Sequence, residues 1–536
     1  MWTQNYTPLA NSLVLSTLAA ALPIFVLLIL IGVLRKPAWI AALCGLGTAL
    51  GVAIAAYGMP PDLAVRSALF GAAFGLLPIG WIVYWAVVLY RITLETGNFE
   101  VIRDSIGGLT SDRRLQAMLV AFAFGAFVEG AAGFGTPVAV AAGMLTGLGF
   151  SPFFAAGICL LANTAPVAFG SIGIPVVTLA GTTGMSELEL SAWVGRLCAP
   201  ISILIPAYLI MVMGGWRALK GVLPAAIVCG ICFAGVQLLV SNFVGPQLVD
   251  ILAALTAILG LVVLFKVWQP RDSFVLAGEQ AAVAIPKKHG FGRTLRAWSP
   301  YLFLVGFVLV WGYAPSKHAL ETTNMVFQWP GLHEAITRVA PMVPTPIPYA
   351  AKYTFNWLAA SGSACALATI GAALVLRVSV GMYIGLLGRV LKQLAFSLLT
   401  IASVLGLAYL MNYSGAVVTL GLAFAATGAL FPFFSALLGW LGVFLTGSDT
   451  SANALFGNLQ VVTANSLGFN PAIMAASNSA GGVMGKMISL QSLAVAVAAT
   501  GMARSEESKL FRFTFSHSVF LAAVLGVIAT IYAYAT

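Results

Sequence analysis

Long apolar runs separated by short polar segments dominate the chain. A helix that crosses a bilayer needs roughly 20 apolar residues, and runs of about this length recur from one end to the other. They occupy residues 13–34, 38–57, 67–90, 198–215, 221–241, 251–265, 300–314, 357–376, 394–411, 415–445 and 519–535. Together with two interrupted segments, 115–180 and 450–500, the pattern predicts an all-α integral membrane protein with on the order of 12 to 14 transmembrane helices.

One interrupted segment combines a lone acid with residues that weaken helices. Residues 127–150, FVEGAAGFGTPVAVAAGMLTGLGF, contain Glu129 and a proline among many glycines. Backbone groups freed at such breaks must be satisfied inside the protein or in a water-filled cavity. The segment therefore predicts a discontinuous helix beside a functional cavity.

The polar stretch 269–296 lies near the centre of the chain, and similar motifs occur on both sides of it. The first half carries GAFVEGAAGFG (125–135), LGFSP (148–152) and ANTAPVAFGS (162–171); the second carries GVFLTGSDTSA (442–452), LGFNP (467–471) and SNSAGGVMGK (477–486). Glycine-rich apolar sequence can align with itself by chance, but three landmarks in one order favour diverged repeats, which point to a transporter site. We predict repeats at 1–268 and 299–536 and a linker at 269–298.

Composition and charge agree with a membrane protein. Hydrophobic residues make up 60% of the chain and charged residues 8%, whereas soluble domains are about 25% charged. Much of the net charge of +10 lies in short basic clusters beside spans, which predicts cytoplasmic loops rather than nucleic-acid binding. This orientation puts the N-terminus and the 242–250 loop outside and the linker inside. The first run predicts a retained span, and residues 315–352 an external loop with a short surface helix.

Histidine and cysteine positions argue against an enzyme. The four histidines, His289, His318, His333 and His517, fall in polar loops or at a span end. No pair within a span is available for haem, no H-E-x-x-H pattern for zinc, and no base for a serine nucleophile. The C-x-x-C motif at Cys229 lies in an apolar run, which favours buried packing over redox chemistry.

Three ionisable residues lie deep in apolar sequence, where a charge costs about 2.5–3.5 kcal/mol. Burial favours the neutral form of Glu129 and exposure to water the ionised form, which suits a proton carrier; the alternative is a helix-end carboxylate bonded to backbone N–H groups. Asp449, among hydroxyl residues, can pair with Lys486, take a proton, help hold a cation or cap a broken helix. Lys486 is a countercharge for an anionic substrate or a structural partner of Asp449.

The matched motifs ANTAP and SNSAG supply amide and hydroxyl groups. Asn163 and Thr164 precede a proline, and Asn478 and Ser479 precede a glycine. Both sites predict helix breaks, and freed N–H groups at half-helix starts favour anions. With Ser477 and Lys486, these side chains are the predicted contacts of a small hydroxylated acid.

Several long strings resemble the bacterial L-lactate permease family, which includes glycolate permeases. They are QNYTPLANSLVLSTLAAALPI (4–24), GAFVEGAAGFGTPVAVAAGML (125–145), ANTAPVAFGSIGIPV (162–176), SNFVGPQLVDI (241–251), GWLGVFLTGSDTSANALFGNLQ (439–460), GGVMGKMISLQSLAVA (481–496) and LFRFTFSHS (510–518). The resemblance implies symport of L-lactate, D-lactate and glycolate with protons across the bacterial inner membrane. The proton is the implied coupling ion, and no cofactor is expected.

A weaker resemblance, to the ion transporter superfamily, implies inverted repeats, re-entrant hairpins and dimeric elevator motion. It leaves open a homodimer and sodium coupling. The hypothesis is that the substrate binds between the two breaks and that Glu129, with Asp449 as second candidate, carries the proton. The alternatives are sodium-coupled dicarboxylate transport, a passive anion channel and an intramembrane enzyme.

Overall fold

The computed structural model describes residues 1–133, 135–272, 274, 289–503 and 506–536. Within this part of the chain, eleven helices are long and apolar enough to cross a membrane, and a bent helix pair brings the number to twelve. The 57 residues of one of them bend at Gly214, Gly215 and Val222, so this helix folds back on itself. The all-α membrane fold predicted from the sequence is therefore confirmed.

The helices of the first half end at the polar linker. They are α1 Leu13–Gly32, α2 Ala38–Ala55, α3 Pro61–Phe74, α4 Trp81–Glu95, α5 Asn98–Gly107, α6 Arg113–Gln116, α7 Gly125–Ala131, α8 Thr136–Gly147, α9 Pro152–Ala162, α10 Gly170–Thr183, α11 Glu187–Phe243 and α12 Val249–Val267. Two π-helical turns, Gly75–Gly80 and Ala117–Phe124, join α3 to α4 and α6 to α7. Each pair thus continues through its turn as one longer segment.

The helices of the second half begin inside the predicted linker. They are α13 Phe291–Gly312, α14 Ala314–Glu321, α15 Ser361–Val375, α16 Val380–Ser414, α17 Ala416–Phe424, α18 Phe431–Thr446, α19 Asp449–Leu467, α20 Pro471–Lys486, α21 Leu490–Thr500 and α22 Glu507–Ala535. Much of the linker predicted at 269–298 lies outside the described residues. Its last part is the start of α13.

The loop predicted to be external carries a surface helix, as expected, and also short strands. α14 has no buried residue. The strands are β1 Trp2–Thr3, β2 Met325–Gln328, β3 Ile336–Arg338, β4 Ile347–Pro348 and β5 Lys352–Phe355. β1 pairs in parallel with β3, which pairs antiparallel with β4, while β2 and β5 form an antiparallel pair. The N-terminus is thereby fixed to this loop.

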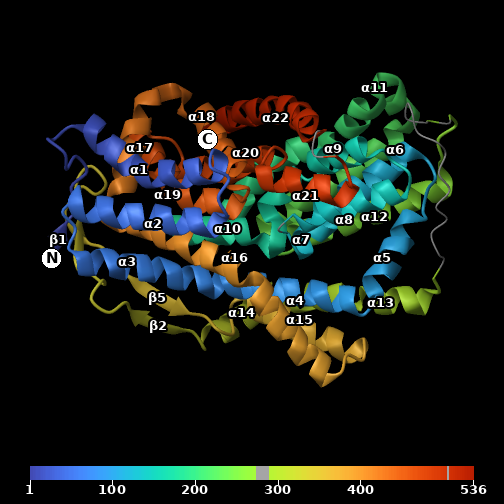
Figure 1. Cartoon of the computed structure of the whole chain (residues 1–536), viewed down its shortest axis with the longest axis horizontal. Helices are drawn as coiled ribbons and strands as arrows, with labels where there is room; N and C mark the ends of the chain where they lie inside the picture. The colour runs from blue at the N-terminus through green and yellow to red at the C-terminus, as the bar shows by residue number, and fades with distance from the viewer. Residues whose placement is uncertain (134, 273, 275–288, 504–505) are drawn as a thin grey trace.

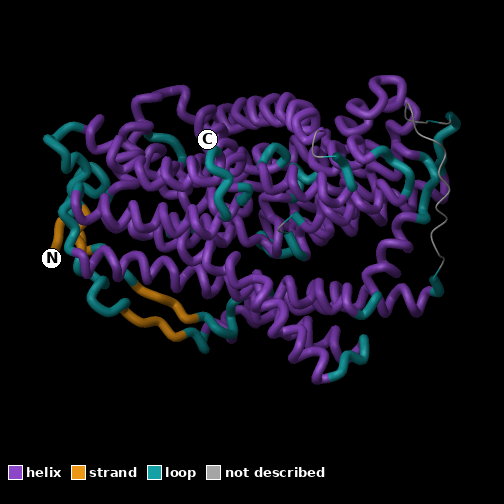
Figure 2. Tube along the Cα trace, viewed as in Figure 1, coloured by secondary structure: helices purple, strands orange, loops and turns teal. Residues whose placement is uncertain are grey.

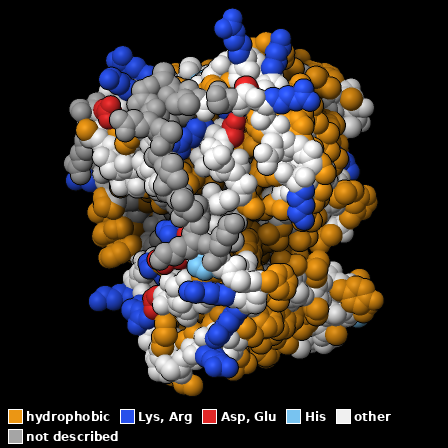
Figure 3. All heavy atoms as spheres, turned by 90° about the vertical axis from the view of Figure 1, so that its right-hand side faces the viewer, with side chains coloured by type: hydrophobic (Ala, Val, Ile, Leu, Met, Phe, Trp, Pro, Cys, Tyr) orange, Lys and Arg blue, Asp and Glu red, His pale blue; other side chains and the backbone are white. Residues whose placement is uncertain are grey.

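The two halves of the chain are interleaved in space. α16 packs against α2 and α3, α15 packs against α4, and α10 packs against α19 (Figure 1). The N-terminus and the strands lie at one end of the long axis, and the linker lies at the other (Figures 1 and 2). Lys and Arg side chains gather around the linker end (Figure 3), where Lys266, Arg271, Arg293 and Arg296 are exposed. The basic linker end and the N-terminus thus occupy opposite ends.

Exposed apolar side chains cover the outer helices. Leu18 of α1, Leu204 and Ile231 of α11 and Leu374 of α15 are between 54% and 74% exposed. Contiguous apolar surface of this kind is not stable against water, but it matches the hydrocarbon of a bilayer. The structure is that of a multi-pass membrane protein.

The repeated motifs form matching helical hairpins. α7 and α8 flank a break that includes Ala132, Gly133 and Gly135, and α18 and α19 flank a break at Gly447 and Ser448. The next helix of each half, α9 or α20, starts with proline after a capping Ser151 or Asn470. Figure 1 places α7 and α8 on the linker side of the centre and α18 and α19 on the other side.

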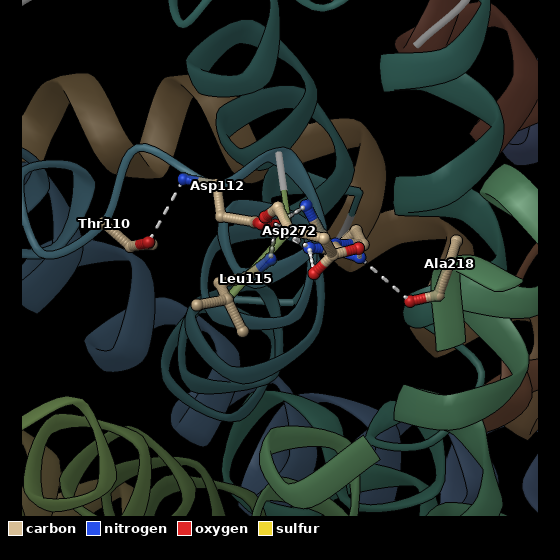
Figure 4. A network of polar contacts seen from close by, with 6 residues as sticks. Thr110, Asp112, Leu115, Ala218 and Asp272 are labelled. Carbon is tan, nitrogen blue, oxygen red and sulfur yellow. Dashed lines mark hydrogen bonds and ion pairs between the residues drawn. The ribbon is translucent and has the colours of Figure 1, made fainter. Parts of the chain in front are cut away.

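A buried arginine anchors the hairpin that carries Glu129. Arg114, at the start of α6, is fully buried and forms ion pairs with Asp112 at 2.7 Å and Asp272 at 2.8 Å. It also donates to the carbonyl of Ala218 at the bend of α11 (Figure 4). The arginine therefore joins the hairpin, the bend and the start of the linker.

We expect Asp272→Asn to lower the melting temperature at neutral pH by a few degrees, because it removes one anion from a buried cation. The hydrogen bonds from Arg114 hold the pKa of the Asp272 carboxyl below its ordinary value. A lowered pKa contributes stability above about pH 4, where unfolded aspartate is ionised. This contribution is lost as the pH falls through the lowered pKa. Melting curves of both proteins should converge in acid; a constant difference from pH 3 to pH 7 would contradict the assignment.

Candidate functional site

The helix breaks come together at the centre of the molecule. α9 and the helical residues 167–183 that follow it are bent by 62°. Ser171, Ile172 and Gly173 all have left-handed φ between 48° and 73°. In the second half, Gly447 is left-handed (φ 72°) and Ser448 caps α19 by accepting from the N–H of Ser451. The interruption predicted within 115–180 is therefore real, and in the second half the helices break at Gly447 and Ser448, just before the predicted segment 450–500, and again after Lys486 within it.

A cavity of about 160 Å³ lies between these breaks and three further helices. Its polar wall comes from α7, α10, the break between α18 and α19, and α20, and its opposite wall from α1, α2 and α16. The lining residues are Leu27, Ile31, Ala38, Ala42, Glu129, Val167, Gly170, Ser171, Ile174, Pro175, Ser397, Thr400, Ile401, Val404, Thr446, Gly447, Ser448, Asp449, Thr450, Ser451, Lys486 and Gln491. All three deep charges that the sequence singled out line this cavity.

Glu129 lies in α7 and is 4% exposed. Its Oε2 has no hydrogen-bond partner among the described residues, so the predicted alternative, a carboxylate held by backbone N–H groups, does not describe this oxygen. Asn163, at the end of α9, lies beside the carboxyl group. An ionised carboxylate with one free oxygen is expensive in a buried site, and the neutral acid is accommodated there more easily.

Asp449 is equally buried, and its Oδ1 likewise has no hydrogen-bond partner among the described residues, but its other oxygen is well satisfied. Its Oδ2 accepts hydrogen bonds from the hydroxyl of Ser479 at 2.6 Å and from the amide of Asn453 at 3.4 Å. Asn453 also donates to the carbonyl of Pro175 in α10 and accepts from Asn478. These donors favour the anionic form of the carboxylate, and Asn453 connects the two repeats.

Lys486 ends α20 and is 7% exposed. Its Nζ donates to the carbonyl of Gly447 at 2.5 Å, and the charge interacts with both Glu129 and Asp449. Within the described chain, neither acid is close enough for an ion pair with Lys486. Of the two sequence-based alternatives, the geometry favours a free countercharge in the cavity over a structural pair with Asp449.

Each acid lies against a glycine of its own repeat. A Cβ added at Gly170 would come within 2.5 Å of Oε1 of Glu129, and one added at Gly482 within 2.3 Å of Oδ1 of Asp449. Both distances are far below van der Waals contact. The two glycines therefore define the positions that the carboxyl groups can occupy.

Gly482→Ala should reduce transport by roughly 5- to 150-fold, since displacing a packed group costs about 1–3 kcal/mol. Initial uptake rates, corrected for the amount of folded protein, measure the loss. Gly235→Ala in α11 is the matched control, because a Cβ there meets no atom within 4 Å. Equal rates for the two variants would show that transport does not require the position of the Asp449 carboxyl group that Gly482 permits.

Five of the predicted substrate contacts do not line the cavity. Ser477, Asn478 and Ser479 are fully buried and lie within a continuous α20, so the helix break predicted at SNSAG is wrong. Side chains at Gly481 and Gly485 would come within 2.0 and 2.3 Å of carbonyl oxygens of α18. The glycines of α20 therefore serve close helix packing, and the helix ends only at Lys486.

The buried amide and hydroxyl groups act instead behind the cavity wall. Ser479 and Asn478 hold Asp449 and Asn453 in place, and Ser477 bonds within its own helix. Thr164 donates to the carbonyl of Leu161. The side-chain amide of Asn163 faces Glu129. It forms no well-aligned hydrogen bond with any described residue. Ser479 and Asn163 therefore position the two acids, whereas Ser477 and Thr164 bond within their own segments.

Sequence reasoning missed several groups. Ser171, Ser448, Thr450 and Ser451 line the cavity; their signal was the clustering of hydroxyl residues around the glycine breaks. Asp250 was assigned to the end of an external loop, but it is 1% exposed in the first turn of α12. A lone acid beside an apolar run was the signal that could have revealed it.

The cavity combines one cation, two acids and many hydroxyls. Lys486 is the basic residue among its described lining, and the first turn of α19 adds backbone N–H groups that favour anions. A cavity of roughly 150 Å³ holds benzene, which has as many non-hydrogen atoms as lactate. The site therefore fits one small hydroxylated monoanion.

Known proteins resemble this chain over most of its length. Residues 16–536 match the family model described as L-lactate permease. The L-lactate permease of Bacillus subtilis (strain 168) is 47% identical, covering 98% of this chain and 97% of that protein. Glycolate permease GlcA of Escherichia coli (strain K12) is 43% identical, covering 99% and 98%. The YdaH transporter of Alcanivorax borkumensis matches with a TM-score of 0.46 and 16% identity, covering 87% of each chain.

Proposed function

Since the chain belongs to the L-lactate permease family, we propose that it carries L-lactate and related 2-hydroxymonocarboxylates, D-lactate and glycolate, by proton symport. The protein is a multi-pass protein of the bacterial inner membrane. Its relatives are named permeases, and transport without chemical change of the acid is the function proposed here. The observation that carries the proposal is a cavity where Lys486 meets two buried acids from matched helix breaks.

The substrate carboxylate binds Lys486 and the first turn of α19. Lys486 already donates to a carbonyl of the break, and an ammonium has two further N–H groups for an anion. The hydroxyl group of the substrate bonds to serine and threonine side chains of the wall, such as Ser171 and Ser448. A dicarboxylate would bring a second negative charge beside Glu129 and Asp449, which disfavours it.

Glu129 carries the proton. Its free oxygen and its burial favour the neutral acid when the site is closed, and contact with water lets it ionise. Asp449 is held ionised by its donors and balances Lys486 when no substrate is present. One proton with one monocarboxylate makes the loaded site neutral, which lowers the energy of moving it across the bilayer.

The wall of the cavity suggests an elevator-type motion. Its polar side comes from α7, α10, the break between α18 and α19, and α20, and its apolar side from α1, α2 and α16. In this proposal the hairpins and α20 move as one body along the apolar side. The few polar groups on that side, Ser397 and Thr400, make it a surface along which a neutral loaded site can slide.

Imposed gradients in proteoliposomes test the proposed function. An inward proton gradient should drive lactate above its equilibrium concentration, whereas a sodium gradient without a pH difference should not. Accumulation driven by sodium, or faster uptake of succinate than of lactate, would replace the proposal by sodium-coupled dicarboxylate transport. Equilibration without accumulation would indicate a channel, and a chemically altered acid an enzyme.

A further inference from the structure

A third buried acid, Asp250, lies next to the proposed site but does not line its cavity. It occupies the first turn of α12 and is 1% exposed. Neither of its carboxyl oxygens has a hydrogen-bond partner among the described residues. The N-terminal turn of a helix favours a negative charge, but no N–H group of α12 donates to this side chain. A purely capping role therefore leaves the residue unexplained.

Asp250 packs against α7, the helix that carries Glu129. A Cβ added at Gly130 would lie 2.7 Å from Cβ of Asp250, and Gly130 directly follows Glu129. The titratable groups that face Asp250 are Glu129 from α7 and the thiol of Cys198 from α11. Of these, Glu129 is the group that can exchange a proton with a carboxyl group near neutral pH.

A second cavity is lined by residues 244–248, which directly precede the start of α12 and Asp250. It has a volume of about 290 Å³ and includes Glu187, Gln247, Leu248, Lys317 and Asn356 in its lining. Gln247 donates to Glu187 at 2.5 Å, and Leu248 stands two residues before Asp250. The lining joins the 242–250 loop to α14, and the sequence places both on the external side. We call this space the outer vestibule.

The balance of buried charges around the cavity also favours acids that can take up and release protons. Glu129, Asp250 and Asp449 are three acids, and Lys486 is the basic side chain that acts on the cluster among the described residues. One ammonium balances one carboxylate. The remaining acids are therefore accommodated in a buried site when they carry protons.

We propose that Asp250 relays protons between the outer vestibule and Glu129, along a path separate from that of the substrate. A hydronium ion in the vestibule protonates the Asp250 carboxylate and leaves water. The protonated Asp250 then passes its proton to the Glu129 carboxylate and is itself left ionised until the next proton arrives. This inference rests on the proposed function, because it requires Glu129 to be the proton carrier.

Asp250→Asn in proteoliposomes tests the relay, because the amide keeps the shape of the side chain but transfers no proton. Net uptake of lactate driven by a pH gradient should fall roughly tenfold or more, as expected for loss of a proton-transfer group. Exchange of labelled lactate at equal pH needs no net proton movement and should stay within about twofold. The slowdown of net uptake in D₂O should become larger than in the wild type, since proton transfer then limits the rate.

Cys198→Ala is the matched control, because it alters another buried group facing Asp250, and both rates should stay unchanged. Net uptake by Asp250→Asn within twofold of the wild type would overturn the relay. An equal loss of exchange and net uptake, with an unchanged effect of D₂O, would also overturn it and make Asp250 structural. Failure of the wild type itself to respond to a proton gradient would instead refute the proposed function.

Discussion

Lys486→Met is expected to abolish lactate uptake at micromolar substrate. The ammonium is the cation of the cavity lining in the described chain, and methionine keeps most of its apolar volume without the charge. A hydrogen bond to a charged group contributes about 1.5–3 kcal/mol, which corresponds to roughly 10- to 150-fold in affinity. The loss is larger still if Glu129 and Asp449 then repel the substrate. Binding measured by calorimetry on the purified protein, together with initial uptake rates, gives both quantities.

Lys392→Met is the matched control for this change. Lys392 is exposed on α16, so its removal should leave the affinity within about twofold, as for most surface substitutions. Tight lactate binding by Lys486→Met would contradict the role of Lys486 as countercharge. Lys486→Arg should bind weakly, because the larger guanidinium does not fit against the Gly447 carbonyl in the same geometry.

Glu129→Gln should uncouple transport from the proton gradient. The amide resembles the protonated acid, so the loaded site still moves and exchange of labelled lactate continues. Net accumulation should disappear, because glutamine cannot release a proton at either side. In the wild type, one proton per lactate gives about tenfold accumulation for each unit of pH difference; in the variant the ratio should be about one.

Two further variants distinguish the role of Glu129 from the roles of other acids. Glu100→Gln changes an exposed acid of α5 and should leave coupling intact. Asp449→Asn should impair exchange and net uptake together, because Asp449 is bonded to Ser479 and Asn453 and positions the cavity wall. If Asp449→Asn instead uncouples while Glu129→Gln does not, Asp449 is the proton carrier.

Much of the fold could be predicted from the sequence. Apolar runs of about 20 residues have few alternatives to helices in a membrane, and the motifs around Gly125 and Gly442 mark hairpins in both halves. The three deep charges could be found for the same reason, because a charge in a span is too costly without a role. All three line one cavity.

The role of the amides could not be predicted, because glycine has two uses in a membrane helix. In FVEGAAG it accompanies a break, whereas in SNSAGGVMGK it lets α20 approach the backbone of α18. The two uses look alike in sequence, so Asn478 and Ser479 were expected at a break in the cavity. They lie behind it and hold Asp449 in place.

The buried position of Asp250 could not be predicted from the sequence for a different reason. Its position at the end of an apolar run is typical of a loop at the membrane surface. The inward position of the start of α12 depends on the packing of this helix against α7 and α11, which a single span does not reveal. Tertiary contacts between distant segments therefore decide whether such an acid meets water or another acid.

Proton movement during lactate transport tests the central claim most directly. Unbuffered proteoliposomes with an external pH dye should show alkalinisation when lactate is added, with about one proton taken up per lactate. Glu129→Gln should show no alkalinisation while it still exchanges labelled lactate. Alkalinisation by Glu129→Gln equal to that of the wild type, at equal lactate flux, would contradict the assignment of Glu129 as the proton carrier.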